Sequence, residues 1–430
     1  MKVLVIGRGG REHALVHMCT KSSLVEEVYC APGSDAIGAM AQLVNVQETD
    51  VKGLATFAEE AGIGLTIVGP EVPLLAGIVD QFQQRGLLIF GPSQKAAQLE
   101  GSKSFAKAFM DRHGIPTASY EVATGIEAVI SWCAKVAPPY VLKADGLAAG
   151  KGVVIALTKQ EAVDTALSFF DGQLGDAGKT IVLEEYLDGE ECSFMVMANG
   201  ENFVTLPISQ DHKRLLEEDQ GPNTGGMGVI APLEHVRFQW QSFIEENIIT
   251  PTLRGMLADG ITYQGVLYAG LMITEDGPKV IEFNARFGDP ETQVVLPMAE
   301  SDLVVTMLQL LNEEKVEKVV WREDFSIGVV LAGSNYPVSS SYGEAVELIE
   351  TADGNLYHAG TTWSNERGGW LTNGGRVALY QAFGNTLQEA QQLVYQVVDQ
   401  VVASGSVRAR RDIGNKLIEF VSESVGQIRK

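Results

Sequence analysis

Short apolar runs alternate with amphipathic stretches along the first hundred residues of the chain. Buried-strand patterns occur at Val3 to Ile6, in "EEVYCA", and before two Gly-Pro pairs in "GLTIVGP" and "GLLIFGP", while Glu12 to Thr20 has a helical pattern. Strands that alternate with helices are typical of right-handed βαβ units and a parallel, doubly wound sheet. Ligands of such α/β sheets gather at the carboxyl ends of the strands, where these glycine turns lie. We therefore predict a Rossmann-like N-terminal domain over residues 1–101.

The pattern changes from Gly101 onward. A helical stretch, "SKSFAKAFMDRHG", precedes a compact αβ segment that ends near Leu187 and joins two of its strands through a glycine-rich loop, as is typical of a mobile lid. Further on, "GVLYAGLMITEDGPKVIEFN" predicts two strands joined by the turn "EDGP". The charged "WREDF" marks a later boundary, and strands follow at "SIGVVLAG" and "GRVALYQAFG". We expect a central domain at 102–324, with its lid at about 120–187, and a small C-terminal α+β domain at 325–430.

Composition narrows the range of partners. The 430 residues include 32 basic and 55 acidic side chains, and the formal charge of −23 argues against nucleic acid and anionic membranes. Any anionic substrate must be attracted by local lysines, arginines and helix N-termini. The chain begins with a strand pattern rather than a secretory signal, and it has no apolar run long enough to cross a membrane. Its four cysteines are far apart and form no CxxC pair, which fits a reducing cytoplasm.

The stretch "KADGLAAGKGV" looks at first like the P-loop of a nucleotide hydrolase. A P-loop needs four residues between its first glycine and the Gly-Lys pair, and then a hydroxyl that reaches Mg²⁺. Here three residues separate Gly146 from Gly150, and Gly152 follows Lys151 in place of the hydroxyl residue. The spacing excludes a P-loop, but the glycines still allow successive backbone amides to approach phosphates.

The strand "KVIEFNARFGD" predicts a polar face, because alternate residues of a strand point to the same side. One face would carry Val280, Glu282, Asn284 and Arg286, if the strand extends that far, and the other would carry Ile281, Phe283 and Ala285. Carboxylate and carbonyl oxygens suit Mg²⁺, and an arginine suits the phosphates that accompany it. The alternative is an ordinary solvated strand face, which Asp289 and Glu291 just beyond argue against.

Two lysines stand where an anion would reach them. Lys143 ends a strand directly before the glycine-rich loop, and Lys103 begins a helix, where its charge opposes the helix dipole. Each lysine alone is equally well explained as a surface residue. The strand in "TIVLEEYL" runs into Glu184 and Glu185 and could form a hinge that reads an adenine ring, with Glu191 near the ribose. Acidic strand ends are common, so this signal is weak by itself.

A loop of high glycine content lies in "SQDHKRLLEEDQGPNTGGMG". Gly225, Gly226 and Gly228 leave many backbone amides accessible, and the charged run from Asp211 to Arg214, which includes Lys213, precedes them. A mixed-charge turn is the alternative, but the glycine content favours contact with a substrate.

Two motifs near the N-terminus suggest sites that the residues do not support. "GRGGREHA" resembles the dinucleotide fingerprint GxGxxG, but Glu12 stands where the third glycine must allow close helix–strand packing. His13 and His17 lie four residues apart on one helix, yet no further ligand completes a zinc site around them. Packing or solvent contacts are the favoured roles of both histidines.

An ordered set of strings is similar to those of the glycinamide ribonucleotide synthetase family, within the ATP-grasp superfamily. The features shared with ATP-grasp enzymes in general are Lys103, Lys143 before the glycine-rich loop, the "EEYL" hinge with Glu191, and the strand with Glu282, Asn284 and Arg286. The more specific strings cover nearly the whole chain in family order: "VLVIGRGGREHAL", "TIVGPEVPL", "GPSQKAAQLEGSKSF", "KADGLAAGKGV", "SQDHKR", "GPNTGGMG", "LYAGLMI", "IEFNARFGDPETQ", "HAGT", "GGRV" and "RDIG".

The resemblance implies an ATP-grasp core with a lid and an ATP-dependent ligase of purine biosynthesis. ATP is expected to convert glycine to glycyl phosphate, which the amine of 5-phosphoribosylamine then attacks to give glycinamide ribonucleotide, ADP and phosphate. Mg²⁺ or Mn²⁺ is the expected metal, nucleic acid and membrane are not expected as partners, and a cytoplasmic monomer is expected. The competing interpretations are another ATP-grasp ligase or carboxylase with a different acid, and an inactive ATP-binding sensor.

The resemblance also implies a role for each matching residue. The implied catalytic residues are Lys143 and Arg286, and the implied metal ligands are Glu282 and Asn284. The implied nucleotide contacts are Lys103, Lys143, Gly150, Gly152, Glu184, Glu185, Leu187, Glu191 and Lys213. The implied substrate contacts are Gly9, Gly10, Arg11, Glu12, Asp211, Gly225, Gly226 and Asp289. The chain departs from the family pattern at Arg8 and in "APGSDAIG", both in the region that holds the phosphoribosyl group in that family.

Overall fold

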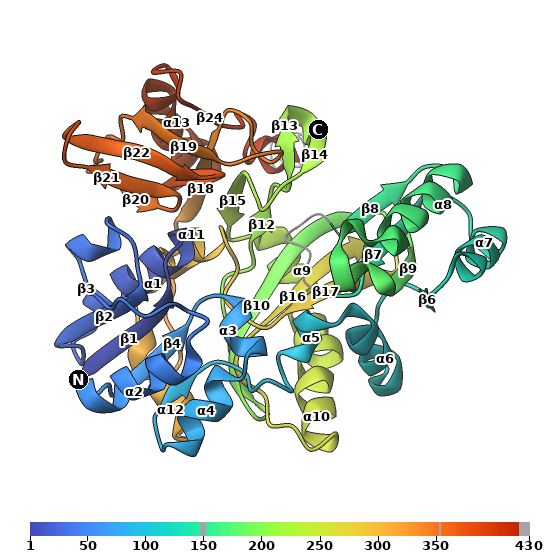
Figure 1. Cartoon of the computed structure of the whole chain (residues 1–430), viewed down its shortest axis with the longest axis horizontal. Coiled ribbons are helices and arrows are strands. Elements are labelled where there is room, and N and C mark those ends of the chain that lie inside the picture. Colours follow the sequence, from blue (N-terminus) through green and yellow to red (C-terminus); the bar gives the residue numbers. More distant parts are fainter. Residues whose placement is uncertain (147–151, 352–353, 421–430) are drawn as a thin grey trace, which may run out of the picture.

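The computed structural model of the protein describes residues 1–146, 152–351 and 354–420 (Figure 1). Its N-terminal part is a parallel sheet of five strands in the order β3-β2-β1-β4-β5. The elements of this part are β1 (Lys2–Gly7), α1 (Gly10–Thr20), β2 (Glu27–Pro32), β3 (Gln42–Leu43), α2 (Val51–Ala61), β4 (Leu65–Val68), α3 (Glu71–Leu75), α4 (Ile78–Gln84) and β5 (Ile89–Phe90).

Helices cover both faces of this sheet, which explains the unbroken apolar run of β1. Leu4 shares an apolar cluster with Leu54 of α2 and Phe82 of α4. Val5, whose side chain points the other way, shares a different cluster with Leu15 of α1. The doubly wound parallel sheet predicted for the N-terminal region is therefore confirmed.

The centre of the molecule is an antiparallel sheet of four strands in the order β11-β10-β16-β17 (Figure 1). Alternate residues of β10 face different layers: Phe194 packs in a cluster with Phe109 of α6, and Met195 in the cluster that includes Val5 of β1 and Met307 of α12. The elements around this sheet are α5 (Gln98–Gly101), α6 (Lys103–His113), β10 (Glu190–Asn199), β11 (Asn202–Thr205), α9 (Glu234–Ile244), α10 (Thr250–Ala258), β16 (Gln264–Thr274), β17 (Gly277–Asn284), α11 (Thr292–Val295) and α12 (Leu303–Leu311).

A smaller antiparallel sheet, in the order β6-β9-β7-β8, stands apart at the right of Figure 1. It has an apolar core of its own, which contains Trp132, Tyr140, Phe169 and Leu183. Its elements are β6 (Tyr120–Ala123), α7 (Ile126–Lys135), β7 (Tyr140–Ala144), β8 (Val153–Ala156), α8 (Lys159–Ser168) and β9 (Ile181–Glu185). We call this unit the lid sheet.

The C-terminal region contributes most of a sheet in the order β12-β15-β18-β23-β20, with β24 paired to β18, and a three-stranded sheet in the order β19-β22-β21. The edge strand β12 and its neighbour β15 come from the region around "SQDHKR" and "GPNTGGMG", so Asp211 is carried by this C-terminal sheet. The elements are β12 (Gln210–Asp211), β13 (Arg214–Leu216), β14 (Gln220–Asn223), β15 (Gly228–Ala231), β18 (Phe325–Gly333), β19 (Ser341–Val346), β20 (Gly354–His358), β21 (Thr361–Ser364), β22 (Gly369–Gly374), β23 (Arg376–Gly384), α13 (Leu387–Val402) and β24 (Val407–Arg408).

The predicted fold class, with an N-terminal doubly wound domain, a core with a lid unit and a C-terminal α+β unit, is confirmed by these sheets. The boundaries at 101 and 324 stay predictions, because β12 and β15 belong to the central segment by sequence but to the C-terminal sheet by pairing. Among the described residues, no helix combines the length and the apolar character that a membrane span requires.

Candidate active site

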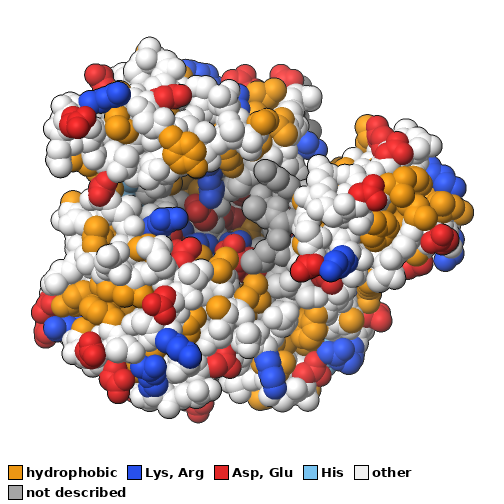
Figure 2. Space-filling view, in the orientation of Figure 1, with side chains coloured by type: hydrophobic (Ala, Val, Ile, Leu, Met, Phe, Trp, Pro, Cys, Tyr) orange, Lys and Arg blue, Asp and Glu red, His pale blue; other side chains and the backbone are white. Residues whose placement is uncertain are grey.

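A hollow separates the lid sheet from the rest of the molecule, and charged side chains of both signs line it (Figure 2). The lid strand β7 ends near β17 of the central sheet, because Lys143 near the end of β7 donates to a backbone carbonyl of β17 at 2.8 Å. The lid and the core therefore meet at these two strands, where the sequence predicts the site.

The polar face predicted on β17 is interrupted by a β-bulge. Leu271 of β16 pairs with Val280 and Gly270 pairs with Glu282, so Ile281 is the extra residue. Val280 is therefore buried in the core beside Phe283, and the prediction that it shares a face with Glu282 is wrong. Beyond the bulge the alternation resumes, and Glu282 and Asn284 lie on one face as predicted.

Arg286 lies past the end of β17, which stops at Asn284, so its predicted place on the strand face is also wrong. Its guanidinium still reaches the site, with Glu71 at 3.2 Å, Glu100 at 2.9 Å, and a hydrogen bond to the Asn284 side-chain oxygen at 3.4 Å. Burial opposes the charge, but Glu100 and Glu71 raise the pKa of Arg286 above its ordinary value. Both glutamates lie in quoted family strings, "TIVGPEVPL" and "GPSQKAAQLEGSKSF", but they were not assigned as site residues.

Two lysines share one carboxylate at the lid side of the hollow. Lys143 Nζ lies 2.8 Å from one oxygen of Glu184, and Lys107 Nζ of α6 lies 2.8 Å from the other. All three side chains are buried. Lys107 was not predicted, because its neighbours in "SFAKAFM" give it the pattern of a polar position on an amphipathic helix.

Lys103 stands at the first turn of α6, where its Nζ donates to the Gly146 carbonyl at 3.1 Å. Burial lowers the pKa of Lys103 below its ordinary value, against the opposing effect of Glu282. The same helix end is capped by Asp145, which accepts a hydrogen bond from the Ser104 amide at 3.1 Å. Lys103 is therefore fixed beside the glycine-rich loop.

Three lysines lie close enough to Glu282 to favour its ionised form. Burial opposes its ionisation, but Lys213, Lys143 and Lys103 together bring the pKa of Glu282 below its ordinary value. Lys213 is itself ion-paired with Glu191. The structure thus brings together four predicted residues, one of them the implied ribose ligand Glu191, around an ionised carboxylate.

The predicted hinge follows the end of β9. The Glu185 carboxylate accepts a hydrogen bond from the Ser119 amide at 2.9 Å, and Leu187 is half-buried just beyond the strand. The Gly152 carbonyl accepts from the Ala144 amide at 2.7 Å, which closes the base of the glycine-rich loop. Gly150 and Lys151 lie outside the described residues.

A second group of predicted residues meets where the three parts of the chain join. Asp289 lies 2.9 Å from the guanidinium of Arg376 on β23, which also donates to the Gly225 carbonyl at 2.5 Å. Gln293 donates to Asp289 at 2.8 Å. Burial opposes the charge, but Arg376 and Arg11 bring the pKa of Asp289 below its ordinary value. Arg376 was missed as a site residue, although it lies in the quoted string "GGRV".

Asp211 lies beside a second buried carboxylate, Glu291. Glu291 accepts hydrogen bonds from Tyr268 at 2.5 Å and Ser193 at 3.1 Å, whereas one Asp211 oxygen, Oδ1, is buried without a hydrogen-bond partner. Burial raises the pKa of the Asp211 carboxyl well above its usual range, and Glu291 adds to the rise. Gly226 has a φ of +109°, and a Cβ there would lie 2.6 Å from Asp211 Oδ1, so only glycine fits against this carboxyl group.

The N-terminal glycines make room for a carboxylate of the chain itself. Glu12 accepts hydrogen bonds from the Gly9 amide at 2.6 Å and the Arg8 amide at 3.2 Å, and it lies 2.5 Å from Arg11 Nε. A Cβ on Gly7 would lie 2.5 Å from the Glu12 Cγ. The resemblance to a dinucleotide fingerprint is thus explained, because Glu12 takes the amides that would otherwise face a pyrophosphate.

The neighbouring N-terminal residues hold α1 against other parts of the chain. A Cβ on Gly10 would lie 2.7 Å from the Gln293 side-chain nitrogen, so this glycine allows α1 to approach α11 closely. His13 accepts a hydrogen bond from the His358 amide at 2.9 Å, and His17 lies 3.2 Å from the Tyr357 hydroxyl. Burial, with His358 and His17, lowers the pKa of His13 to about 3. Both helix histidines therefore serve the packing of α1 on β20.

The loop "APGSDAIG" also contacts the C-terminal region. Asp35 accepts hydrogen bonds from the Thr362 hydroxyl at 2.7 Å and the Trp363 amide at 2.8 Å. This departure from the family pattern therefore has a structural partner in β21.

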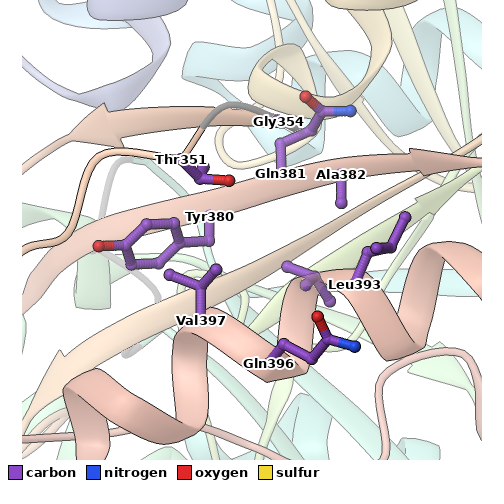
Figure 3. A pocket seen from close by; sticks show the side chains of 9 residues that line it. Thr351, Gly354, Tyr380, Gln381, Ala382, Leu393, Gln396 and Val397 are labelled. Atoms are coloured by element: carbon purple, nitrogen blue, oxygen red, sulfur yellow. The ribbon is translucent and has the colours of Figure 1, made fainter.

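A separate cavity of about 50 Å³ lies between β23 and α13 (Figure 3). Tyr380, Leu393, Val394 and Val397 form much of its wall, and no charged side chain lines it. The cavity therefore lacks charged groups that could hold a phosphate or a metal.

Comparison with known families matches the chain in three consecutive segments. Residues 1–100 match the phosphoribosylglycinamide synthetase N domain, residues 101–292 match the phosphoribosylglycinamide synthetase ATP-grasp (A) domain, and residues 326–416 match the phosphoribosylglycinamide synthetase C domain.

Similar proteins and structures agree with this match. A phosphoribosylamine–glycine ligase of Vibrio parahaemolyticus is 48% identical over 427 residues, which cover 97% of this chain and 99% of the relative. The crystal structure of phosphoribosylamine–glycine ligase from Thermotoga maritima has a TM-score of 0.84 and 35% identity, covering 96% of this chain and all of that one. The biotin carboxylase domain of 2-oxoglutarate carboxylase from Hydrogenobacter thermophilus, solved with MgADP and bicarbonate, shares the fold at 16% identity, with a TM-score of 0.74 over 95% of this chain and 90% of that one.

Proposed function

The chain belongs to the phosphoribosylglycinamide synthetase family, the one that its sequence resembles, and on this ground we propose that it is an ATP-dependent carbon–nitrogen ligase. The ligase joins glycine to 5-phosphoribosylamine and forms glycinamide ribonucleotide, ADP and phosphate in purine biosynthesis. The observation that carries this assignment to particular residues is the proximity of Lys103 and Lys143 to Glu282 where the lid meets the core.

The lysines and the lid loop are the proposed phosphate site. Lys143 precedes the glycine-rich loop in the chain and pairs with Glu184, and Lys103 donates to the carbonyl of Gly146, the first glycine of that loop. Groups that are held before a substrate arrives need no reorganisation when charge develops on a phosphoryl group. The proposed nucleotide contacts at the hinge are the backbone of Glu185 and Leu187, with Glu191 and Lys213 at the ribose side.

Glu282 and Asn284 are the proposed metal ligands. A carboxylate and an amide oxygen on one strand face are hard donors, and the lysine field keeps Glu282 ionised. This donor set fits Mg²⁺ or Mn²⁺, which complete their shells with water and substrate phosphates. A cation bound there would offset the charge of the transferring phosphoryl group. The family relationship supports ATP and a divalent metal, and Mg²⁺ or Mn²⁺ is our choice for it.

The chemistry follows from these positions in two steps. A carboxylate oxygen of glycine attacks the γ-phosphorus of ATP, the bond to the ADP oxygen breaks, and glycyl phosphate forms. The amine nitrogen of phosphoribosylamine then attacks the glycyl carbonyl carbon, and phosphate leaves with the electrons of the C–O bond. Lys143 and Arg286 stabilise the charge on the phosphoryl oxygens, and closure of the lid excludes the water that would hydrolyse the acyl phosphate.

Asp211 is the proposed partner of the glycine ammonium group. Its Oδ1 atom is buried without a hydrogen-bond partner, and such an atom is costly unless a donor reaches it. Burial and Glu291 raise the pKa of Asp211, and the positive charge of an ammonium group would oppose this rise. Gly225, Gly226 and Asp289 line the same side, and Gly9 to Glu12 are the proposed contacts of the phosphoribosyl group.

Turnover with labelled glycine tests both the activity and the intermediate. We expect ADP to form only when glycine and phosphoribosylamine are both present, and ¹⁸O from the glycine carboxylate to appear in the released phosphate. ADP formation at the same rate without glycine would contradict the proposed ligase. Dependence on glycine without ¹⁸O in phosphate would contradict the glycyl phosphate step alone.

The cellular location and the oligomeric state are further parts of the proposal. All four cysteines are free and buried, which fits the cytoplasm we propose. A monomer is also our proposal, and sedimentation of the purified protein at working concentration measures it directly.

A further inference from the structure

Lys107 is the most deeply buried lysine beside the proposed nucleotide site, and the mechanism above gives it no role. Its side chain is 2% exposed, and its Nζ lies 2.8 Å from Glu184 Oε2 and donates to the Thr117 hydroxyl at 2.8 Å. A charged lysine is hardly ever buried so completely unless it is paired. Its position therefore calls for an explanation beyond the packing of α6.

The carboxylate of Glu184 is divided between two lysines. Its Oε1 lies 2.8 Å from Lys143 and its Oε2 lies 2.8 Å from Lys107, while its side chain is 4% exposed. Each oxygen therefore lies within ion-pair distance of a different lysine. The three groups together carry a formal charge of +1 when both lysines are protonated.

Both lysines are also tied to the strand that bears Glu282. Lys143 donates to the Ile281 carbonyl at 2.8 Å, which the bulge turns toward it. Lys107 donates to Thr117, whose hydroxyl donates to the Val280 carbonyl at 2.6 Å. The ion trio therefore connects α6 and the lid strands β7 and β9 to the two residues that directly precede Glu282.

We propose that Lys107 is a positioning residue of the nucleotide site: it occupies one oxygen of Glu184, so that Lys143 keeps a fixed position and the trio keeps a net positive charge toward the phosphates. Without Lys107, Glu184 and Lys143 form a pair with no net charge, and the attraction for a phosphate anion falls. The inference rests on the proposed function in so far as ATP is the anion.

Removing Lys107 and Glu184 separately and together tests this inference. The variants are Lys107→Met, Glu184→Gln and the double variant, and the probe is a non-hydrolysable ATP analogue with Mg²⁺, measured by calorimetry beside the KM values for ATP and glycine. The matched control is Lys135→Met, which removes an exposed lysine that pairs with Glu121 in the same lid unit.

If the net charge of the trio governs phosphate binding, the affinities of the variants for the ATP analogue should follow an unusual order. Lys107→Met should weaken analogue binding about tenfold and raise the KM for ATP with it, while the KM for glycine and the Lys135→Met control stay unchanged. Glu184→Gln leaves two buried lysines without their carboxylate, so we expect this variant to have a lower free energy of unfolding than the unaltered protein. The double variant has lost one charge of each sign, so its net charge is again +1, and its affinity should return to within about threefold of the unaltered protein.

A purely structural Lys107 gives the opposite order. In that case the two losses add, and a double variant that binds more weakly than Lys107→Met overturns the proposal, as does a Lys107→Met protein with unchanged affinity. Should Lys107→Met not fold, the double variant still decides, because affinity more than about tenfold below that of the unaltered protein contradicts the charge account. Failure of the unaltered protein to bind the analogue would instead contradict the proposed function.

Discussion

Two clusters of buried charged side chains in the proposed site are built in opposite ways. In the lysine cluster, Lys107 and Lys143 share the single carboxylate of Glu184, and Lys103 lies near Lys143, so positive groups outnumber this carboxylate. The carboxylate cluster (Asp211, Asp289 and Glu291) has more acids than direct cationic partners. Asp289 pairs with Arg376, Glu291 is held by neutral hydroxyls, and Asp211 has an oxygen without a hydrogen-bond partner.

The difference indicates what each cluster receives. A positive surplus in a buried place is stable when an anion completes it, and a negative surplus when a cation does. Phosphates suit the first cluster and an ammonium group suits the second. Glu282, whose ionisation is favoured by lysines on both sides, is suited to a metal between them.

The largest effect is expected from Glu282→Gln, which removes the ionised carboxylate of the proposed metal site. Turnover should fall by at least about 100-fold, because the metal loses its only proposed charged ligand and the phosphoryl charge is less well balanced. The measurement is kcat over a Mg²⁺ titration, in which the loss should not be recovered at high metal. Glu275→Gln, an exposed change in the turn between β16 and β17, is the matched control and should be silent.

Lys143→Met should separate the lysine cluster from the carboxylate cluster. We expect kcat/KM for ATP to fall by about 100-fold. The substitution removes a charge that attracts the phosphates, and it leaves one oxygen of Glu184 without its lysine partner. The KM for glycine should change little. An increase of the glycine KM as large as the change for ATP would show that the clusters are not independent.

Asp211→Asn probes the other side with a smaller effect. The amide keeps the size of the side chain but loses the charge, so we expect the KM for glycine to rise about tenfold while analogue affinity is retained. Thermal unfolding should be unchanged or shifted upward, because a buried carboxyl group with a raised pKa beside Glu291 is unfavourable in the free protein. Weaker analogue binding with unchanged glycine KM would contradict this assignment.

The sequence predicted most of the features that depend on local patterns, namely the longer strands and the residues within recognisable motifs. The alternation of apolar runs gave β1, β4, β16 and β17, because a strand in a covered sheet must be apolar on the buried positions. The motif strings located Glu282, Asn284 and Lys143, which the structure gathers in one hollow. The pairing of β15 with β12 and β18 could not be predicted, since strand pairing depends on contacts between residues far apart in the chain.

The errors have specific physical causes. The bulge at Ile281 moved Val280 into the core, and a single inserted residue leaves no mark in an alternating pattern. Lys107 and Glu100 look like solvated helix residues, because burial of a paired charge depends on its partner, and each partner lies many residues away. The sequence shows that Glu12 breaks the dinucleotide pattern. It does not show that the Glu12 carboxylate accepts a hydrogen bond from the Gly9 amide and so fills the loop.

The smallest effect, and the one that contrasts the clusters most directly, is expected from alkaline pH. Burial lowers the pKa of Lys107 to about 8, and the groups that face it are Glu184 and Glu185 on β9, Lys143 on β7 and the ring of Tyr120 on β6. The lysine cluster therefore carries its full charge below about pH 8 and loses it as the pH rises through that value. Affinity for the ATP analogue should fall a fewfold between about pH 7 and 9, with proton uptake on binding, because the anion favours the protonated lysine.

The carboxylate cluster should respond with the opposite sign, because a carboxyl group with a raised pKa, such as Asp211, gains charge as the pH rises. The measurement is analogue titration in buffers of different ionisation enthalpy, with Lys107→Met as the comparison. The variant has no lysine to titrate at this position, so its affinity should not vary over the same range. A fewfold fall that persists in Lys107→Met would assign the titration to another group and remove the contrast.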